Sequence, residues 1–374
     1  MHLLAICLAL TAASPPADDR ALYDRACQQV AAAFDSARGG FVARSHVPSD
    51  AAVELGLLRG RQAGSEAWRD QALATIAWSR CLRDTLTGGF VAGGGNDEPT
   101  DAHAQKSASV NARRLENLND AWHLTEAAGY QRDAARVVDF FDRALLDGRG
   151  GFLAGQGTDL ELVPDANGLA IHAWLGWAAA TRDTMRRNFG FRSLDRVWQQ
   201  CWMPDIGLVR RGMFGEVLAP PQLVDQVEVG RALVLAARLM DGRADQDHAR
   251  MLGDLLVTRF QDPERGGFSA RWEPTGKGTA KRSGRSSADN ARAARFLCEL
   301  TTLTGDTKYR DAARRAWGDL ARELDKPSLD AADWALALEA ALEPALPDRP
   351  QWPTAAERTT PPEWRPMNFK VAGN

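Results

Sequence analysis

The sequence predicts an all-α chain of the (α/α)6 toroid class, a closed ring of six helical hairpins. The first observation is a repeat: a Gly-Gly-aromatic motif ends at Phe41, Phe90, Phe152 and Phe268, with a degenerate copy at Leu208. The second is that an amphipathic segment precedes each copy and a more apolar segment follows it after a loop. An open α-solenoid is the alternative, but six units complete a ring before a Pro-rich tail begins, which favours closure.

The first segment of each unit is predicted to form an outer helix, because only one of its faces is apolar. In the first unit, Leu22, Ala26 and Val30 recur at helical spacing, with charged residues opposite. The predicted outer helices span residues 18–36, 65–83, 131–146, 188–202, 244–260 and 306–324.

The second segment is predicted to form an inner helix, because it is richer in Ala and Leu and poorer in charge. Capping residues such as Ser49, Ser107 and Ser286 open several of these helices. In a toroid the helix starts and the long loops share one face, where helix N-termini favour anionic or oxygen-rich ligands. The predicted inner helices span residues 49–60, 107–128, 165–181, 222–241, 286–304 and 329–343.

The glycines of the repeated motif are interpreted as turn residues with positive φ after each outer helix. A loop shaped to hold a ligand is the alternative. Repetition argues against it, because hairpin turns are expected once per unit and ligand loops are not.

The chain divides into a predicted signal peptide at residues 1–17, a barrel at 18–345 and a Pro-rich tail at 346–374. The apolar run from Leu3 to Ala13 is too short to span a bilayer, and no later segment is long enough, so we expect a secreted or periplasmic protein without a membrane span. A disordered start is the alternative. A net charge of -3 argues against nucleic acid as a partner. No metal-ligand spacing or nucleotide fingerprint occurs, so no metal or cofactor is expected.

Several short stretches, in the same order, resemble the helical barrel of the spermatogenesis-associated protein 20 family, in which a thioredoxin-like domain precedes the barrel. HAQKSASVNA is similar to the family's HFEKMLYDNA, and ANGLAIHA is similar to SWNGLMIAA. QLVDQVEVGRAL and SSADNARAARFL resemble later segments of that barrel. The matched positions are His103, Lys106, Asn111, Ala112, Asp159, Asn167, Gly168, Asp225 and Asn290.

This resemblance implies mainly the fold. The thioredoxin-like domain is absent, which leaves room for a separate thioredoxin-like partner, and Gln105 and Val110 stand where the family has acids. The chain resembles N-acylglucosamine 2-epimerase and six-hairpin glycosidase toroids more remotely. Two functions stay open: a carbohydrate-active protein of hydrolase or epimerase/isomerase type, and a non-catalytic ligand-binding or scaffold barrel.

Candidate catalytic residues follow from these chemistries. A glycoside hydrolase needs two carboxylates across a cleft, and Asp225 and Asp289 stand at starts of inner helices. Their other possible role is helix capping or a buried hydrogen bond. A sugar epimerase can use histidine as general acid and base, and His103 and His172 are the candidates. A single helical histidine is more often a core residue.

Candidate substrate-binding residues lie near the predicted rim. Trp272 is the preferred ring for stacking on a sugar. The loop TGKGTAKRSGRSS carries Arg282 and Arg285 and predicts a small-molecule or glycan ligand with negative charge, the alternative being a flexible solvated loop. The remaining candidates are Lys106, Asn111, Asn167 and Asn290.

Overall fold

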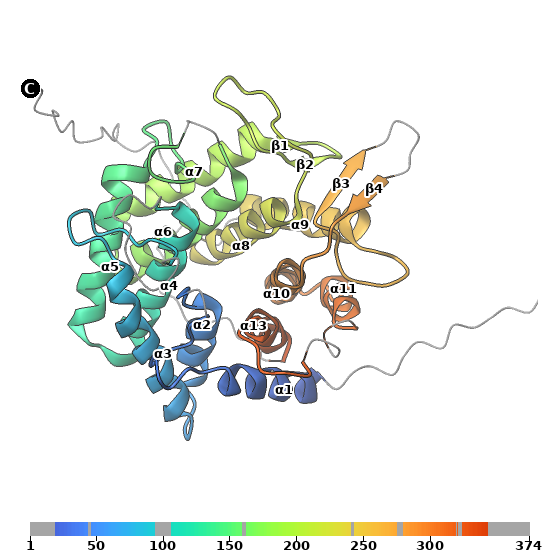
Figure 1. Ribbon diagram of the computed structural model, residues 1–374. Coiled ribbons are helices and arrows are strands. Elements are labelled where there is room, and N and C mark those ends of the chain that lie inside the picture. Colours follow the sequence, from blue (N-terminus) through green and yellow to red (C-terminus); the bar gives the residue numbers. More distant parts are fainter. Residues whose placement is uncertain are drawn as a thin grey trace, which may run out of the picture.

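The structure is a computed structural model that describes residues 19–43, 46–93, 106–158, 162–240, 243–274, 280–318, 320 and 324–342, with backbone only for 273–274 and 280–283. The predicted signal peptide and the whole of the predicted tail lie outside these residues. The described chain is a ring of helices in two layers (Figure 1). The predicted all-α toroid is therefore confirmed.

The inner layer is a closed circle. Each inner helix packs against the next one along the chain, and the last, α13, packs against the first, α2. In the described part of the chain, the inner helices are α2 (Asp50–Arg59), α4 (Ala108–Thr125), α6 (Pro164–Thr181), α8 (Leu223–Met240), α10 (Ser287–Thr304) and α13 (Ala331–Leu342). The contact between α13 and α2 excludes the open solenoid.

The outer layer covers this circle. Each inner helix from α2 to α10 has its main outer-layer contact with the outer helix that follows it, because the connection between them is short. The long loops lead from an outer helix to the next inner one. Single turns extend three outer helices, at Arg80–Leu82, Phe141–Leu145 and Leu256–Phe260. The outer helices are α1 (Asp19–Ala32), α3 (Glu66–Ser79), α5 (Ala128–Phe140), α7 (Thr184–Cys201), α9 (Arg243–Leu255) and α11 (Lys308–Ala316).

The two ends of the barrel are joined by α1, which packs on α13 and so completes the outer layer. Tyr23, Ala26 and Val30 of α1 are buried in the core. The Arg314 guanidinium binds Asp19 at 2.8 Å, and Arg25 Nε donates to the Leu324 carbonyl at 3.1 Å. The first outer helix therefore pairs with the last inner helix.

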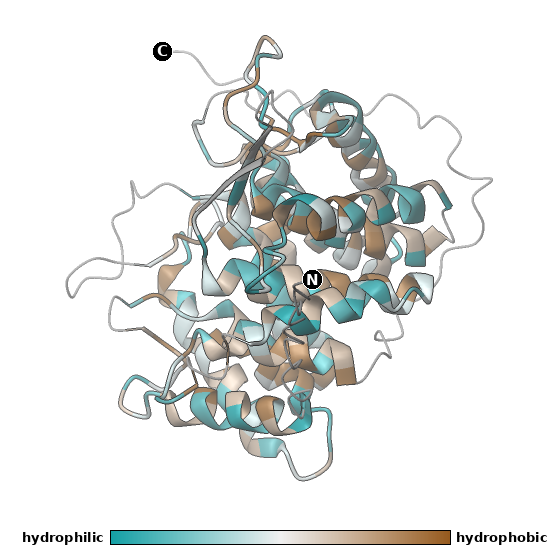
Figure 2. Ribbon diagram, turned by 90° about the vertical axis from the view of Figure 1, so that its right-hand side faces the viewer, coloured by the Kyte–Doolittle hydropathy of each residue, from teal (hydrophilic) through white to brown (hydrophobic). Residues whose placement is uncertain are grey.

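The distribution of buried residues differs between inner and outer helices. α6 is buried along almost its whole length, as its mostly apolar sequence predicts, whereas α9 buries only one side. The hydropathy colouring in Figure 2 shows apolar and polar stretches alternating on such helices. The Ser49, Ser107 and Ser286 hydroxyls cap α2, α4 and α10, as predicted.

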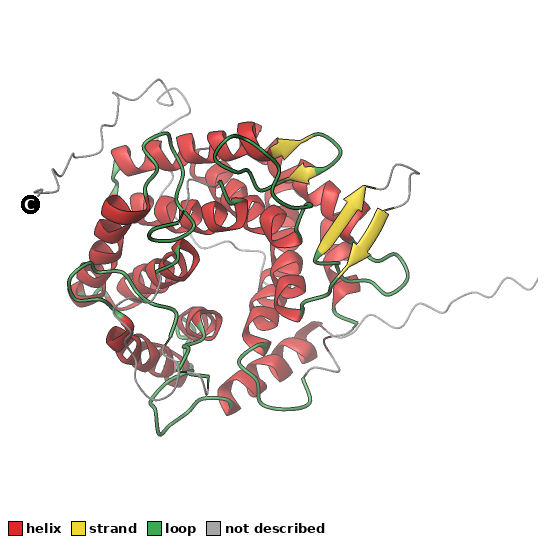
Figure 3. Ribbon diagram, turned by 45° about the horizontal axis from the view of Figure 1, so that its top comes forward, coloured by secondary structure: helices red, strands yellow, loops and turns green. Residues whose placement is uncertain are grey.

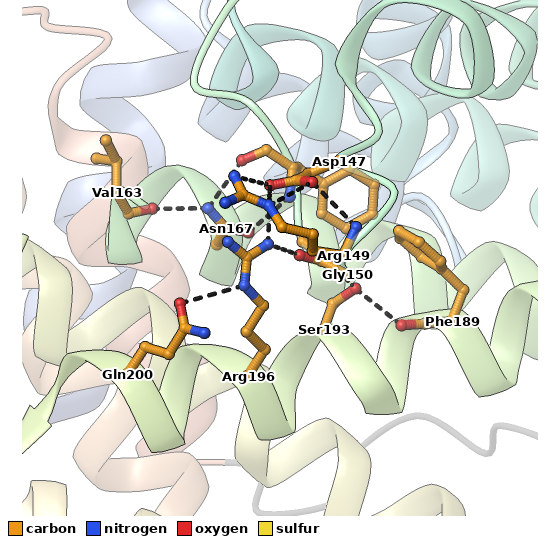
Figure 4. Close-up of polar contacts among 11 residues, drawn as sticks. Asp147, Arg149, Gly150, Val163, Asn167, Phe189, Ser193, Arg196 and Gln200 are labelled. Carbon is orange, nitrogen blue, oxygen red and sulfur yellow. Dashed lines mark hydrogen bonds and ion pairs between the residues drawn. The ribbon is translucent and has the colours of Figure 1, made fainter. Parts of the chain in front are cut away.

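The Gly-Gly-aromatic motifs form the turns after the outer helices. Gly150 and Gly151 have φ of 98° and 99°, which only glycine adopts readily, and the following Phe152 is buried. The Asp147 carboxylate accepts a hydrogen bond from the backbone N–H of Arg149. It also forms an ion pair with Arg196 at 2.9 Å (Figure 4). The interpretation of the glycines as turn residues is confirmed.

An amide from the next inner helix holds four of these turns, whereas in the first the Phe41 N–H donates to the Thr75 hydroxyl at 2.9 Å. The Phe152 N–H donates to Asn167 Oδ1 at 2.8 Å, and Asn167 Nδ2 donates to the Phe152 carbonyl at 2.9 Å. The amide therefore satisfies both backbone groups of a buried residue. The same pair of bonds joins Asn111 to Phe90, Gln226 to Leu208 and Asn290 to Phe268.

The inner helices all begin on the end of the ring that carries the long loops, which we call the helix-start face. Two small antiparallel hairpins lie side by side there, on one side of the ring (Figure 3). They are β1 (Trp202–Met203) with β2 (Gly207–Leu208), and β3 (Arg271–Pro274) with β4 (Ala280–Ser283). Among the described residues, no helix is both long and apolar enough to cross a membrane.

Candidate functional site in the ring interior

The ring interior is lined by charged side chains that stand at equivalent positions of the inner helices. Glu116, His172, Arg231 and Arg295 are each the ninth residue of α4, α6, α8 and α10. The amides that hold the turns are the fourth residues of the same helices. Five residues rotate a helix by about 140° beyond a full turn, so the ninth residues face away from the turns.

Two ion pairs join inner helices that are not neighbours in the ring. Arg113 of α4 binds Glu228 of α8 at 3.2 Å, although α6 lies between these helices. Arg295 of α10 binds Glu54 of α2 at 2.6 Å, although α13 lies between them. Both pairs must therefore reach through the interior.

Arginine side chains lower the pKa values of the interior carboxyl groups. Burial by itself would raise the pKa of Glu54, but the Arg295 guanidinium brings that pKa down to about 2. Burial likewise opposes ionisation of Glu299, and Arg231 and Arg295 together lower its pKa. Arg231 Nε lies 3.4 Å from Glu299. Because their pKa values are lowered, Glu54 and Glu299 are ionised, and guanidinium groups hold both.

His172 and Glu116 form a hydrogen-bonded pair inside the ring, from His172 Nδ1 to Glu116 Oε1. Burial would raise the pKa of Glu116, but the charge and hydrogen bond of His172 lower it. Among the described residues, the other imidazole nitrogen, Nε2, makes no hydrogen bond, and the His172 side chain is 14% exposed. This arrangement orients an imidazole and leaves one nitrogen for a ligand.

A second group of charges lies at the helix-start face, where α6 and α8 begin. Arg210 binds both Asp225, at 3.2 Å from Nε, and Asp165, at 3.2 Å from Nη2. The Asp225 side chain is fully buried and accepts the backbone N–H of Asp165 at 3.2 Å. Burial and then the neighbouring Asp165 charge raise the pKa of Asp225 to about 7. The contacts of Asp225 are those of a buried hydrogen-bonding residue, the role that the sequence analysis gave as the alternative to catalysis.

A third group lies where α10 and α13 begin. Arg292 Nε lies 3.3 Å from Asp333 and Nη1 lies 3.6 Å from Asp289, so two carboxylates share one guanidinium. Asp289 is 23% exposed. Burial raises its pKa, Arg292 and the Ser286 hydroxyl oppose this, and Glu228 and Asp333 add to the rise. Asp289 is therefore accessible, unlike Asp225.

The asparagines predicted to bind substrate hold the turns with their amides. Asn111, Asn167 and Asn290 are buried, and their amides are occupied by the turns and by the carbonyls at the helix starts. Lys106 is also buried, with its ammonium 2.7 Å from Asp84 of the second turn. Arg285 donates to the Gly266 carbonyl of the fourth glycine pair at 2.9 Å. These residues stabilise turns because polar groups near a turn must be satisfied when it is buried.

The expected stacking residue is also differently placed. Trp272 is 2% exposed and packs edge-on against Phe260, with the Arg259 guanidinium over its ring, so it offers no face to a sugar. Its ring packs on the last turn of an outer helix, a contact that the loop-like sequence did not reveal. His103 lies outside the described residues, as does the side chain of Arg282, whose backbone belongs to β4.

Sequence reasoning missed most of the interior residues. It found His172 but not its partner Glu116, nor Glu54, Arg231, Arg292 and Arg295. A signal was present: with four of the inner helices, α4, α6, α8 and α10, aligned at their starts, the ninth positions read Glu, His, Arg and Arg. Charges at one register of otherwise apolar helices indicate a shared polar interior.

No protein-family model and no curated protein matches the sequence. Solved structures match it over nearly the whole chain. The chain is similar to a D-mannose isomerase, with a TM-score of 0.71 and 13% identity over 89% of this chain and 100% of the other. It is similar to a cellobiose 2-epimerase from Bacillus thermoamylovorans, with a TM-score of 0.69 and 11% identity over 86% and 98%.

A hydrolase has a similar fold. The GH76 α-mannanase of Bacteroides thetaiotaomicron matches with a TM-score of 0.65 and 10% identity, over 87% of this chain and 95% of the other. Identities this low establish the fold alone, because one fold hosts many functions. The resemblance to the spermatogenesis-associated protein 20 family stays a prediction. The described chain is a (α/α)6 toroid of the kind found in these sugar isomerases, epimerases and glycosidases.

Proposed function

We propose that this protein is a carbohydrate-active enzyme that moves a proton on a sugar, in the manner of an isomerase or epimerase, with His172 as the acid–base group. The carrying observation is the His172–Glu116 pair, whose imidazole Nε2 makes no hydrogen bond with the described part of the chain and is surrounded by charged residues. The fold shared with a D-mannose isomerase and a cellobiose 2-epimerase supports a sugar as the substrate.

The chemistry needs a base beside the carbon next to a sugar carbonyl. Histidine suits this task because its unperturbed pKa lies near neutral pH. With the Nδ1 proton held by the Glu116 carboxylate, Nε2 carries the lone pair and can take the proton from carbon. Return of the proton to the neighbouring carbon, with transfer of the hydroxyl proton from one sugar oxygen to the other, gives isomerisation. Delivery of a proton to the opposite face of the same carbon, by a second acid or after the intermediate has turned over, gives epimerisation.

Guanidinium groups of the interior fit the charge that would develop. Removal of the proton places negative charge on the sugar oxygen, and preorganised donors stabilise such charge. Arg231 lies close enough to Glu116 to lower the pKa of its carboxyl and contacts Glu228 at 3.8 Å and Glu299 at 3.4 Å, so it belongs to the same cluster. We propose Arg231 as the donor for that oxygen.

A glycoside hydrolase is the second candidate, favoured by Asp289. A general acid needs a carboxyl with a raised pKa, and burial raises the pKa of Asp289 against the opposing charge of Arg292. Asp333 shares Arg292 with it and would be the second carboxylate. The fold shared with a GH76 α-mannanase supports this alternative.

Proton exchange into heavy water separates these candidates. An isomerase or epimerase incubated with its sugar in D2O incorporates deuterium at the carbon it deprotonates, which NMR detects without knowledge of the product. We expect exchange on at least one member of a panel of aldoses and ketoses, and its loss in His172→Asn. Release of reducing ends from a glycan panel, abolished in Asp289→Asn, would instead establish the hydrolase.

A non-catalytic sugar-binding barrel predicts a third result. Wild-type protein would then bind a sugar in saturation-transfer NMR, yet neither exchange protons nor cleave glycans. If no sugar binds at all and none reacts, the proposed function is wrong.

We also propose that the protein is exported. The support is the apolar stretch from Leu3 to Ala13, followed by small residues up to Ala17. Cell fractionation followed by N-terminal sequencing tests this proposal: an exported chain begins near Asp18, whereas a retained chain begins at its first residues.

A further inference from the structure

Two carboxylates hold the Arg231 guanidinium group, each at a different nitrogen. Arg231 Nε donates a hydrogen bond to Glu299 Oε2 of α10 at 3.4 Å, and Nη1 lies 3.8 Å from Glu228 Oε2. The contact with Glu228 is an ion pair that is too long for a hydrogen bond. Within the part of the chain that the structure describes, Glu299 is therefore the one hydrogen-bond acceptor of Arg231.

The third nitrogen of this guanidinium group, Nη2, is left for a ligand. It makes no hydrogen bond with the described residues, yet it is not one of the buried side-chain atoms that lack a partner, so solvent reaches it. A guanidinium group is planar, so contacts at Nε and Nη1 also fix the directions of the N–H groups on Nη2.

Arg231 lies beside the His172–Glu116 pair. Burial raises the pKa of Glu116, but His172 and then Arg231 lower it. Burial likewise raises the pKa of Glu299, but nearby cations, Arg231 and His172 among them, lower it. Because such effects weaken with distance, the imidazole and the guanidinium group lie close to the same two carboxylates.

Glu299 is itself fixed from its other side. Arg295 Nε donates to Glu299 Oε1 at 2.9 Å, and Arg295 Nη2 donates to Glu54 of α2 at 2.6 Å. Each oxygen of the Glu299 carboxylate therefore accepts from a different arginine. An ionised carboxylate engaged at both oxygens is a poor proton carrier, but it holds its partners in place.

We propose that Glu299 is a positioning residue, which aims Arg231 Nη2 at the sugar oxygen that becomes negatively charged when His172 takes the proton. This inference rests on the proposed function. A donor stabilises a transition state best when it is already in place, and a displacement of about 1 Å can reduce the rate about 10²-fold. Without Glu299, the guanidinium group would keep only its longer contact with Glu228.

The test measures deuterium exchange on whichever sugar the wild-type protein deprotonates. Glu299→Gln removes the charge and keeps the size of the side chain. We expect kcat to fall about 10–100-fold while KM stays nearly unchanged, because the contact it supports strengthens in the transition state. Glu264→Gln, on an exposed turn, is the matched control and should exchange like the wild type.

A double-mutant cycle shows whether Glu299 acts through Arg231. In an Arg231→Ala background, Glu299→Gln should lower kcat by less than about twofold, because the group that it positions is gone. Equal losses in both backgrounds would show a merely structural role and overturn the inference, as would an Arg231→Ala variant that exchanges at the wild-type rate.

Chemical rescue gives an independent measurement. Added ethylguanidine should restore part of the exchange rate of Arg231→Ala, because Glu299 still offers an acceptor for the free guanidinium ion. It should restore little in the double variant, which lacks that carboxylate. Equal rescue in the two proteins would contradict the proposed role of Glu299.

Glu299→Asp covers the case in which Glu299→Gln does not fold. It keeps the charge but is one methylene shorter, so it can stay with Arg295 and withdraw from Arg231. We expect near-wild-type melting with a lowered kcat. If a folded Glu299 variant exchanges at the wild-type rate, the inference is wrong and the sugar site stands; if the wild type exchanges no sugar, the proposed function fails and the inference falls with it.

Discussion

His172 and Glu116 occupy the same position on neighbouring inner helices, the ninth residue of α6 and of α4, and their side chains share a hydrogen bond inside the ring. Because α4 and α6 pack side by side, equal height on the two helices brings the pair together. The carboxylate fixes the orientation of the imidazole, which is the condition for directed proton transfer.

Replacing this carboxylate tests the pair directly. Glu116→Gln is expected to lower kcat for deuterium exchange and to leave KM nearly unchanged, because the amide keeps the shape but no longer stabilises a positively charged imidazole. His172→Gln should cost more, about 10²–10⁴-fold, the range typical of a lost general base.

His248 provides the control for this series. It lies on the outer layer, stacked on Trp198 with ring centroids 3.9 Å apart, so His248→Asn should leave the exchange rate unchanged. Equal rates in Glu116→Gln and wild type would show that the hydrogen bond has no part in the reaction.

The turn amides make a prediction about stability. Asn167→Ala leaves the N–H and carbonyl of buried Phe152 without partners, and each unpaired group costs about 1–3 kcal/mol. We therefore expect a loss of about 2–4 kcal/mol in the free energy of unfolding, measured by urea denaturation.

Leu86→Ala serves for comparison. Leu86 is 88% exposed at the second turn, so its truncation should change stability by less than about 0.5 kcal/mol. An Asn167→Ala variant as stable as Leu86→Ala would mean that water replaces the amide.

Asp225 predicts a pH dependence of stability. Its pKa in the folded chain is about 7, above the ordinary value of 3.8, so the folded state holds a proton that the unfolded state releases. This contribution is complete below the unfolded pKa and is lost as the pH rises through about 7. The difference between the two pKa values corresponds to at most about 4 kcal/mol.

Asp225→Asn removes this titration. The difference in unfolding free energy between pH 5 and pH 8 should be smaller in the variant than in the wild type. Parallel pH profiles of the two proteins would contradict the raised pKa. The pH profile of the variant must be compared with that of the wild type, because other carboxyl groups titrate in both and only the difference reports Asp225.

The ion pair between Glu54 and Arg295 predicts coupling across the ring. Arg295→Met leaves Glu54 without its partner at a site that is 23% exposed, and we expect a loss of about 2–3 kcal/mol, below the range for fully buried pairs. Replacing both residues, as Glu54→Leu with Arg295→Met, should restore part of that loss.

A double-mutant cycle over these variants measures the coupling. A coupling energy near zero would show that the two side chains do not depend on each other. Arg20 and Asp24, an exposed pair on α1, offer the reference cycle, for which well below 1 kcal/mol is expected.

Most of the fold was predictable from local patterns. The six outer and six inner segments, the serine caps and the glycine turns all follow from periodicity and from the conformational freedom of glycine, which depend on neighbours in the chain. Trp272 shows the limit: its ring is buried against Phe260 of an outer helix, a contact that no periodicity predicts.

The site depended on contacts between distant segments. Asn111, Asn167 and Asn290 were identified as special positions, but whether an amide at a helix start meets a ligand or a turn depends on which backbone lies opposite. Asp225 and Asp289 both stand at the third position of an inner helix, yet only Asp289 keeps an accessible carboxylate.

Sequence patterns thus established the ring, its two layers and its turns, because those features come from interactions within one hairpin. Closure of the ring determines which charged side chains come into contact. Glu54 and Arg295 lie far apart in the chain, and His172 reaches Glu116 only because α4 and α6 begin at the same face. The chemistry of the interior belongs to the tertiary structure, since pairing and pKa depend on distances between helices that no single segment encodes.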